Sequence, residues 1–136
     1  MGQQQLLLII LGVIVVGIAV AVGITMFTDN AISANRDAVT NDLVNLAARA
    51  QQFYRRPTAL GGGGNNFTGL TADPAGLRKL TNRETNANGQ YSITSAGNAT
   101  GVVLQGVGTE MVDGTNYVTM EIHVSNTKSD SVVIVH

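Results

Sequence analysis

The chain contains no cysteine and no tryptophan, and only two of its 136 residues are proline. The lack of cysteine excludes disulfides, thiol catalysis and cysteine-based zinc sites. Three Phe and three Tyr provide few rings on which nucleic-acid bases could stack. The formal net charge of −1 gives no electrostatic attraction to nucleic acid or anionic lipid. We therefore expect no nucleic-acid contact, and the length predicts a single domain.

Charge is scarce, and it is absent from the start of the chain. Charged residues make up 12% of the sequence, about half the share in an average soluble domain, and none precedes Asp29. The run from Leu6 to Phe27 is entirely uncharged. As a helix it would be roughly 33 Å long, which matches a bilayer core of about 30 Å. We assign residues 1–28 as an apolar helix of a membrane or of a filament core.

Three interpretations of this apolar run stay open. It is too long for a cleavable secretory signal, has no basic n-region, and lacks a clear A-x-A cleavage site. It fits a plain membrane anchor by length and composition. The third interpretation is a helix that first lies in the membrane and later packs against copies of itself. Gly12, Gly17 and Gly23 favour this interpretation, because small residues let helix backbones approach closely.

Residues 29–56 are expected to continue the same helix with an amphipathic pattern. No Pro or Gly interrupts the segment from Thr28 to Arg56. Apolar residues recur at spacings of four and three, which places them on one helix face: Val39, Leu43, Leu46, Ala50 and Phe53. Pro57 should end the helix, since the residue before proline disfavours the α conformation. Asp29 and Asn30 could alternatively cap a new helix and introduce a kink.

Residues 57–89 are predicted to form a glycine-rich loop and a short helix. A phosphate-binding loop would need Lys-Ser or Lys-Thr after its glycines, whereas Asn65 and Asn66 follow here. The four glycines therefore indicate a flexible or tightly turned connection. The segment 73–80 can form a short helix with Asp73 as N-cap and Pro74 at its first position. The nearby basic residues Arg78, Lys79 and Arg83 are expected to face solvent.

Residues 90–136 have the pattern of an antiparallel sheet. Four segments rich in Val, Ile, Thr and Tyr are separated by turn residues: Gln90–Ser95, Val102–Val112, Tyr117–Ser125 and Ser131–His136. Apolar and polar residues alternate from Val118 to Val124, so one face should be buried against the helix residues Val39, Leu43, Leu46 and Phe53. The expected fold is α+β and ladle-shaped, with a long N-terminal helix packed on three or four strands.

No residue pattern indicates catalysis or cofactor binding. No spacing brings His123 or His136 together with a carboxylate, and we expect His123 to face solvent. Asp113-Gly114 resembles a fragment of a calcium loop but lacks the later carboxylate, so a hairpin turn explains it better. Asn66 and Asn98 begin glycosylation sequons, which are candidate modification sites. We expect a protein that is not an enzyme and that uses no metal or cofactor.

The architecture resembles the type IV pilin superfamily. The resemblance covers the whole chain but is specific only in residues 1–54. It is carried by the stretch GQQQLLLIILGVIVVGIAVAVGI and by NRDAVTNDLVNLAARAQQFYRRPTALGGGG after it. The same two stretches also resemble a group of bacterial pilin-like proteins.

This resemblance implies a subunit that is held in the inner membrane and then extracted by pilus assembly machinery into a helical homopolymer at the cell surface. In the family a leader peptidase removes a short leader. If Met1 is the processed terminus, Gln5 stands where the family has a glutamate. Gly12, Gly17 and Gly23 would loosen the helix where the family often has proline. The residues implied to form the filament core are Met1, Gln5, Leu6, Leu8, Ile10, Leu11, Val15, Ile18, Val22 and Phe27.

Two other functions remain as alternatives. A pseudopilin or minor pilin of a secretion machine would share the architecture. A single-pass membrane protein displaying a small binding domain would share the apolar helix but would not polymerise. The resemblance leaves adhesion, motility and DNA uptake equally open as roles of a filament.

Overall fold

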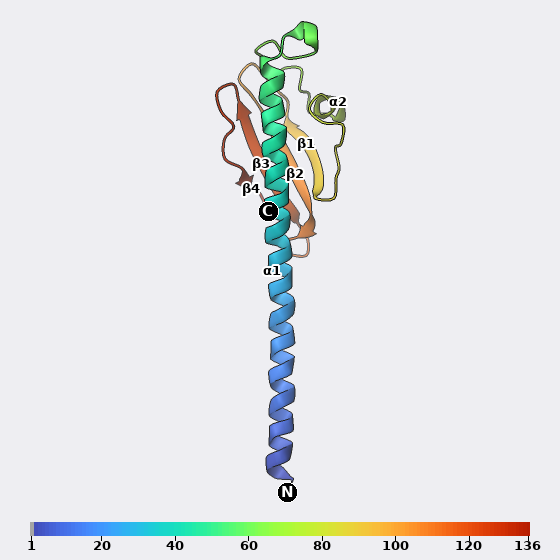
Figure 1. The fold of residues 1–136 in the computed structure, drawn as a ribbon, viewed down its shortest axis with the longest axis vertical. Helices are drawn as coiled ribbons and strands as arrows, with labels where there is room; N and C mark the ends of the chain where they lie inside the picture. Colours follow the sequence, from blue (N-terminus) through green and yellow to red (C-terminus); the bar gives the residue numbers. More distant parts are fainter. Residues whose placement is uncertain (1) are drawn as a thin grey trace.

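The computed structural model describes residues 2–136, and a single long helix dominates it (Figure 1). Helix α1 (Gln3–Arg55) has 53 residues, which corresponds to about 80 Å at 1.5 Å per residue. It runs through Asp29 and Asn30 without interruption, so no new helix begins there. The first half extends away from the rest of the chain, and the second half lies against the sheet (Figure 1).

Helix α1 ends where Pro57 predicts that it should. Arg56 is extended, with φ −72° and ψ 133°, as expected for a residue before proline. The 3₁₀ helix η1 (Thr58–Leu60) follows, and the glycine-rich loop then folds back on the end of α1. The amides of Gly63 and Asn65 donate hydrogen bonds to the carbonyls of Phe53 and Tyr54. The loop is thus a tight turn that satisfies helix carbonyls which would otherwise lack partners.

A four-stranded antiparallel sheet follows, with its strands in sequence order β1-β2-β3-β4. Its strands are β1 (Gly89–Ser95), β2 (Gly101–Met111), β3 (Tyr117–Ser125) and β4 (Val133–Ile134). The short helix α2 (Pro74–Arg78) lies before β1, and the Asp73 carboxylate accepts a hydrogen bond from the Gly76 amide as its N-cap. Strand β4 is shorter than the six residues expected, because only its two residues pair with β3 at the sheet edge.

The core lies between the second half of α1 and one face of the sheet. Val39 and Leu43 of α1 are fully buried, as are Leu104 of β2 and Val118 of β3. The segment between α1 and β1 adds Phe67, Leu70, Leu77 and Leu80 to this core. The expected α+β fold, a long N-terminal helix on a small antiparallel sheet, is therefore confirmed.

Asn35 is a buried polar residue on the packed face of α1, and it fastens the helix to an irregular part of the sheet. Its Oδ1 accepts hydrogen bonds from the Thr109 and Glu110 amides at 3.1 and 3.4 Å, and its Nδ2 donates to the Asn88 carbonyl at 2.9 Å. The pairing of β2 with β3 is interrupted at this point, between Val107 and Met111. Gly108 lets Asn35 approach, since a Cβ there would lie 1.9 Å from Oδ1.

We expect Asn35→Ala to lower the free energy of unfolding by about 2–4 kcal/mol, because it leaves buried backbone groups without partners. Urea unfolding of the full chain in detergent, followed by circular dichroism, measures this change. Asn45→Ala is the matched control, since Asn45 is exposed on the same helix. Equal effects of the two substitutions would contradict a role for Asn35 as a structural link.

Candidate assembly surface: the uncovered half of the long helix

The first half of α1 carries a large apolar surface that nothing in the subunit covers. Each large apolar side chain between Leu6 and Phe27 has at least 52% of its surface exposed. Ile32 is the first residue of α1 to be buried. The helix therefore changes from uncovered to packed between Phe27 and Ile32, within little more than one turn.

Helix α1 is also long and apolar enough to cross a membrane, and it is the one helix within residues 2–136 with this property. The uncharged run lies near the N-terminus, and none of its most apolar window is buried. This arrangement is compatible with membrane anchoring through the first half of α1. The head formed by the sheet and the second half of α1 would then lie outside the lipid.

The residues predicted to form a filament core lie on this uncovered half. Those that are described and exposed are Gln5, Leu6, Leu8, Ile10, Leu11, Val15, Ile18, Val22 and Phe27. Met1 lies outside the described residues. Because α1 turns about 100° per residue, these side chains point all around the helix and do not form one stripe. Neighbours could thus contact the helix from several sides.

Gly12, Gly17 and Gly23 lie within the continuous helix, and the helix is not interrupted at any of them. A Cβ added at any of these positions meets nothing within 4 Å. Contacts within the subunit therefore do not require glycine there, although each glycine weakens a helix by about 1 kcal/mol relative to alanine. Loosening of the helix at these glycines stays a prediction.

Val39, Leu43, Leu46 and Phe53 lie on the opposite half of α1, all of them buried. They pack in the core with the residues of β2 and β3. This packing fixes the direction in which the uncovered half leaves the head.

A polar cluster that the sequence did not reveal joins α1 to the start of β1. The Asp42 Oδ2 accepts hydrogen bonds from Tyr91 Oη at 2.5 Å and from the Asn86 and Asn88 Nδ2 atoms at 2.9 Å each. Partial burial by itself would raise the pKa of Asp42, but these three hydrogen bonds together outweigh it and lower the pKa. Burial and the neighbouring Asp42 carboxylate raise the pKa of Tyr91, so its hydroxyl stays a donor.

We expect Tyr91→Phe to lower the free energy of unfolding by about 1 kcal/mol at pH 7, because Asp42 loses one donor. A carboxylate whose pKa is lowered on folding stabilises the protein above its unfolded pKa of about 3.9, and this contribution disappears as the pH falls through the folded pKa. The difference between wild type and variant should therefore shrink below pH 4. Urea unfolding at pH 7 and pH 3 measures it, with the exposed Tyr117→Phe as control. A difference that did not change with pH would contradict this role.

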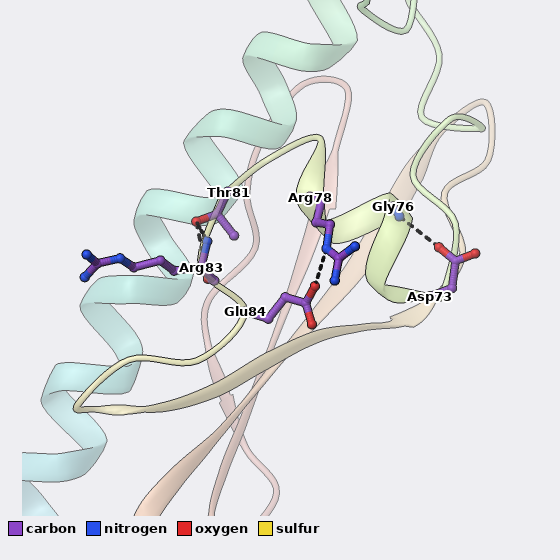
Figure 2. A network of polar contacts seen from close by, with 6 residues as sticks. All are labelled: Asp73, Gly76, Arg78, Thr81, Arg83 and Glu84. Carbon is purple, nitrogen blue, oxygen red and sulfur yellow. Dashed lines mark hydrogen bonds and ion pairs between the residues drawn. The ribbon is translucent and has the colours of Figure 1, made fainter.

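Basic side chains gather beside this cluster, along a groove between α1 and the segment 78–86. The groove has a volume of about 820 Å³, and Arg49, Arg78, Lys79 and Arg83 line it. Figure 2 shows that Arg78 pairs with Glu84, at 2.8 Å between Nε and Oε1, while the Arg83 side chain points away from that pair. Arg49 donates a hydrogen bond to the Leu80 carbonyl. Arg78, Lys79 and Arg83 are exposed, as expected.

The remaining candidates from the sequence lie apart from this groove. The Asp113 carboxylate accepts hydrogen bonds from the Thr115 and Asn116 amides, so its segment forms a hairpin turn. His123 is exposed, as expected, and within residues 2–136 no group of three or more His, Asp or Glu residues could hold a metal ion. Asn98 is exposed and Asn66 is half-buried. Glycosylation of either stays a prediction.

Comparisons of the chain with family models, curated proteins and solved structures found no match. The case for a function therefore rests on the residues and on the geometry of the uncovered helix.

Proposed function

We propose that this protein is the structural subunit of a helical filament at the cell surface, similar to a type IV pilus, that polymerises through the first half of α1. The observation that carries the proposal is that the first half of α1, which is apolar, extends from the head and is covered by nothing in the subunit on any side. Before assembly the same helix holds the subunit in the membrane. Its partners are copies of itself, and the assembly machinery and leader peptidase follow from the resemblance to pilins.

The free-energy cost of exposing the first half of α1 to water indicates that this half is covered by a partner. Sixteen large apolar side chains between Leu6 and Phe27 are exposed. Burial of one such side chain contributes about 1.5–3 kcal/mol, so covering all of them is worth on the order of 20 kcal/mol or more. That amount exceeds the stability of a typical domain, which is about 5–15 kcal/mol. The helix must therefore be covered by lipid or by protein.

The glycines favour protein over lipid as the final environment. A helix that stays in lipid would gain nothing from glycine at these positions, because alanine is equally compatible with lipid and is the better helix former. A neighbouring helix instead benefits from Gly12, Gly17 and Gly23, because they let two backbones approach closely. The second candidate is a single-pass anchor that displays the head as a binding domain, and the match between the apolar run and the bilayer thickness favours it.

Electron microscopy of material sheared from the source cells, together with mass spectrometry of its subunit, separates these two functions. We expect thin helical filaments that contain this protein with its apolar helix intact in the core. Finding the protein only in detergent extracts of membranes, as a monomer or small oligomer, would contradict the filament and support the anchored binding domain.

A further inference from the structure

Most of the charged residues of the head lie in two groups of opposite net charge. Five of the eight basic residues line two adjoining grooves beside the C-terminal part of α1. We call this the basic surface: Arg49, Arg56, Arg78, Lys79 and Arg83. Asp42 lines the first groove, Glu84 pairs with Arg78, and Asp73 lies close enough to Lys79 to interact with its charge, so basic residues exceed acidic ones by two.

The other group surrounds α1 at the end of the head from which the uncovered helix leaves, since Asp37 is about 200° around the helix from Asn35, which faces the sheet. We call it the acidic surface: Asp29, Asp37, Glu110 and Asp113. Glu110 is placed beside this part of α1 by the hydrogen bond from its amide to Asn35, and Asp113 lies in the turn between β2 and β3 at the same end (Figure 1). Hydrogen bonds from Asn116 and Thr115 lower the pKa of Asp113, so it stays ionised. Arg36 is the basic residue among them, so acidic residues exceed basic ones by three.

Neither of the two ion pairs within residues 2–136 joins the basic surface to the acidic surface. Asp37 and Arg49 are twelve residues apart on α1, so they are separated by about 18 Å along the helix axis. Screening in physiological salt limits such interactions to about 8 Å. Each surface therefore remains available to another molecule of opposite charge.

We propose that the basic surface of one copy binds the acidic surface of the next copy along the filament. Asp37 and Arg49 differ by about 120° around the axis of α1 as well as by their axial distance. A neighbouring copy must therefore be both shifted along the axis of α1 and rotated about it to bring its Asp37 close to Arg49 of the first copy. A contact between two different surfaces that combines a shift with a rotation builds an open helical polymer. The inference rests on the proposed filament function and adds the surfaces that set the register of its subunits.

Nucleic acid is a poorer partner for the basic surface. Asp42 lines the groove and Glu84 pairs with Arg78, so both reduce its positive charge. The Tyr91 ring is buried and offers no surface for stacking. The acidic surface, in contrast, carries an excess of the opposite charge on the same chain.

Charge reversal in the source cells tests the contact. The variants are Arg56→Glu with Arg83→Glu on the basic surface, and Asp29→Arg with Asp37→Arg on the acidic surface, because these exposed side chains do not take part in the hydrogen bonds that hold the head together. We expect each pair to reduce sheared filaments at least tenfold. The four substitutions in one chain should restore filaments to within about twofold of wild type. Cells producing both variants together should form mixed filaments.

Several outcomes would overturn the inference. Filament yield unchanged by either reversal, or not restored by combining them, would show that the surfaces do not meet. Normal filaments that lose binding of duplex DNA after Arg56→Glu and Arg83→Glu would assign the groove to a polyanion instead. Lys128→Glu controls for added negative charge, and circular dichroism checks folding. Wild-type cells without filaments would overturn the proposed function itself, which separates the two failures.

Discussion

Val15→Asp should remove the protein from the membrane fraction and abolish filaments. Val15 lies in the middle of the uncharged run and is 55% exposed in the subunit. A charged residue at the centre of a membrane helix costs about 2.5–3.5 kcal/mol on insertion scales, which corresponds to a loss of inserted protein of about 70- to 400-fold. The same carboxylate would have no partner in a core of apolar helices. Immunoblots of fractionated cells and of sheared material measure both effects.

Val44→Asp provides the matched control for this substitution. Val44 lies on the same helix with a similar exposure of 49%, but on the half that belongs to the head. The carboxylate introduced by Val44→Asp would stay in water, so insertion of the helix into the membrane should be unchanged. If Val44→Asp depleted the membrane fraction as strongly as Val15→Asp, the first half of α1 would not be the anchoring segment.

Leu43→Ala should lower the free energy of unfolding of the head by about 2–5 kcal/mol. Leu43 is fully buried between α1 and the sheet, and its truncation removes apolar burial and leaves a cavity. Because many domains are stable by only about 5–15 kcal/mol, the loss should be visible as a large shift of the urea midpoint. Circular dichroism of the full chain in detergent follows the transition.

Val44→Ala is the neighbouring control, because Val44 faces away from the sheet and should change stability by less than about 0.5 kcal/mol. Comparable losses of stability for Leu43→Ala and Val44→Ala would contradict the packing of the Leu43 face of α1 against the sheet.

The strongest periodic signals in the sequence predicted the fold well. The uncharged run and the spacing of Val39, Leu43 and Leu46 predicted one helix with two different halves, because both signals come from burial and extend over many residues. The alternation from Val118 to Val124 predicted the buried face of β3 for the same reason. Pro57 marked the end of α1, and the structure ends the helix at Arg55.

Features that depend on contacts between distant segments could not be predicted in this way. Asn35 occupies a position in the buried stripe, between Ile32 and Val39, and its polarity there was the available signal. Its partners in β2 lie more than seventy residues away in the chain. Asp42 likewise has partners that become neighbours only once β1 is in place. Short edge strands such as β4 carry too few residues for a pattern to develop.

The continuity of α1 has a mechanical consequence. A polymer held together by the uncovered halves of its helices would carry tension along those helices. Each helix would act as a rod that transmits force to the neighbouring helices by shear. The sheet lies beside this load path, attached to the side of the rod. Stretching such a fibre would slide or extend helices first, at positions such as Gly17 and Gly23, while the heads stayed folded.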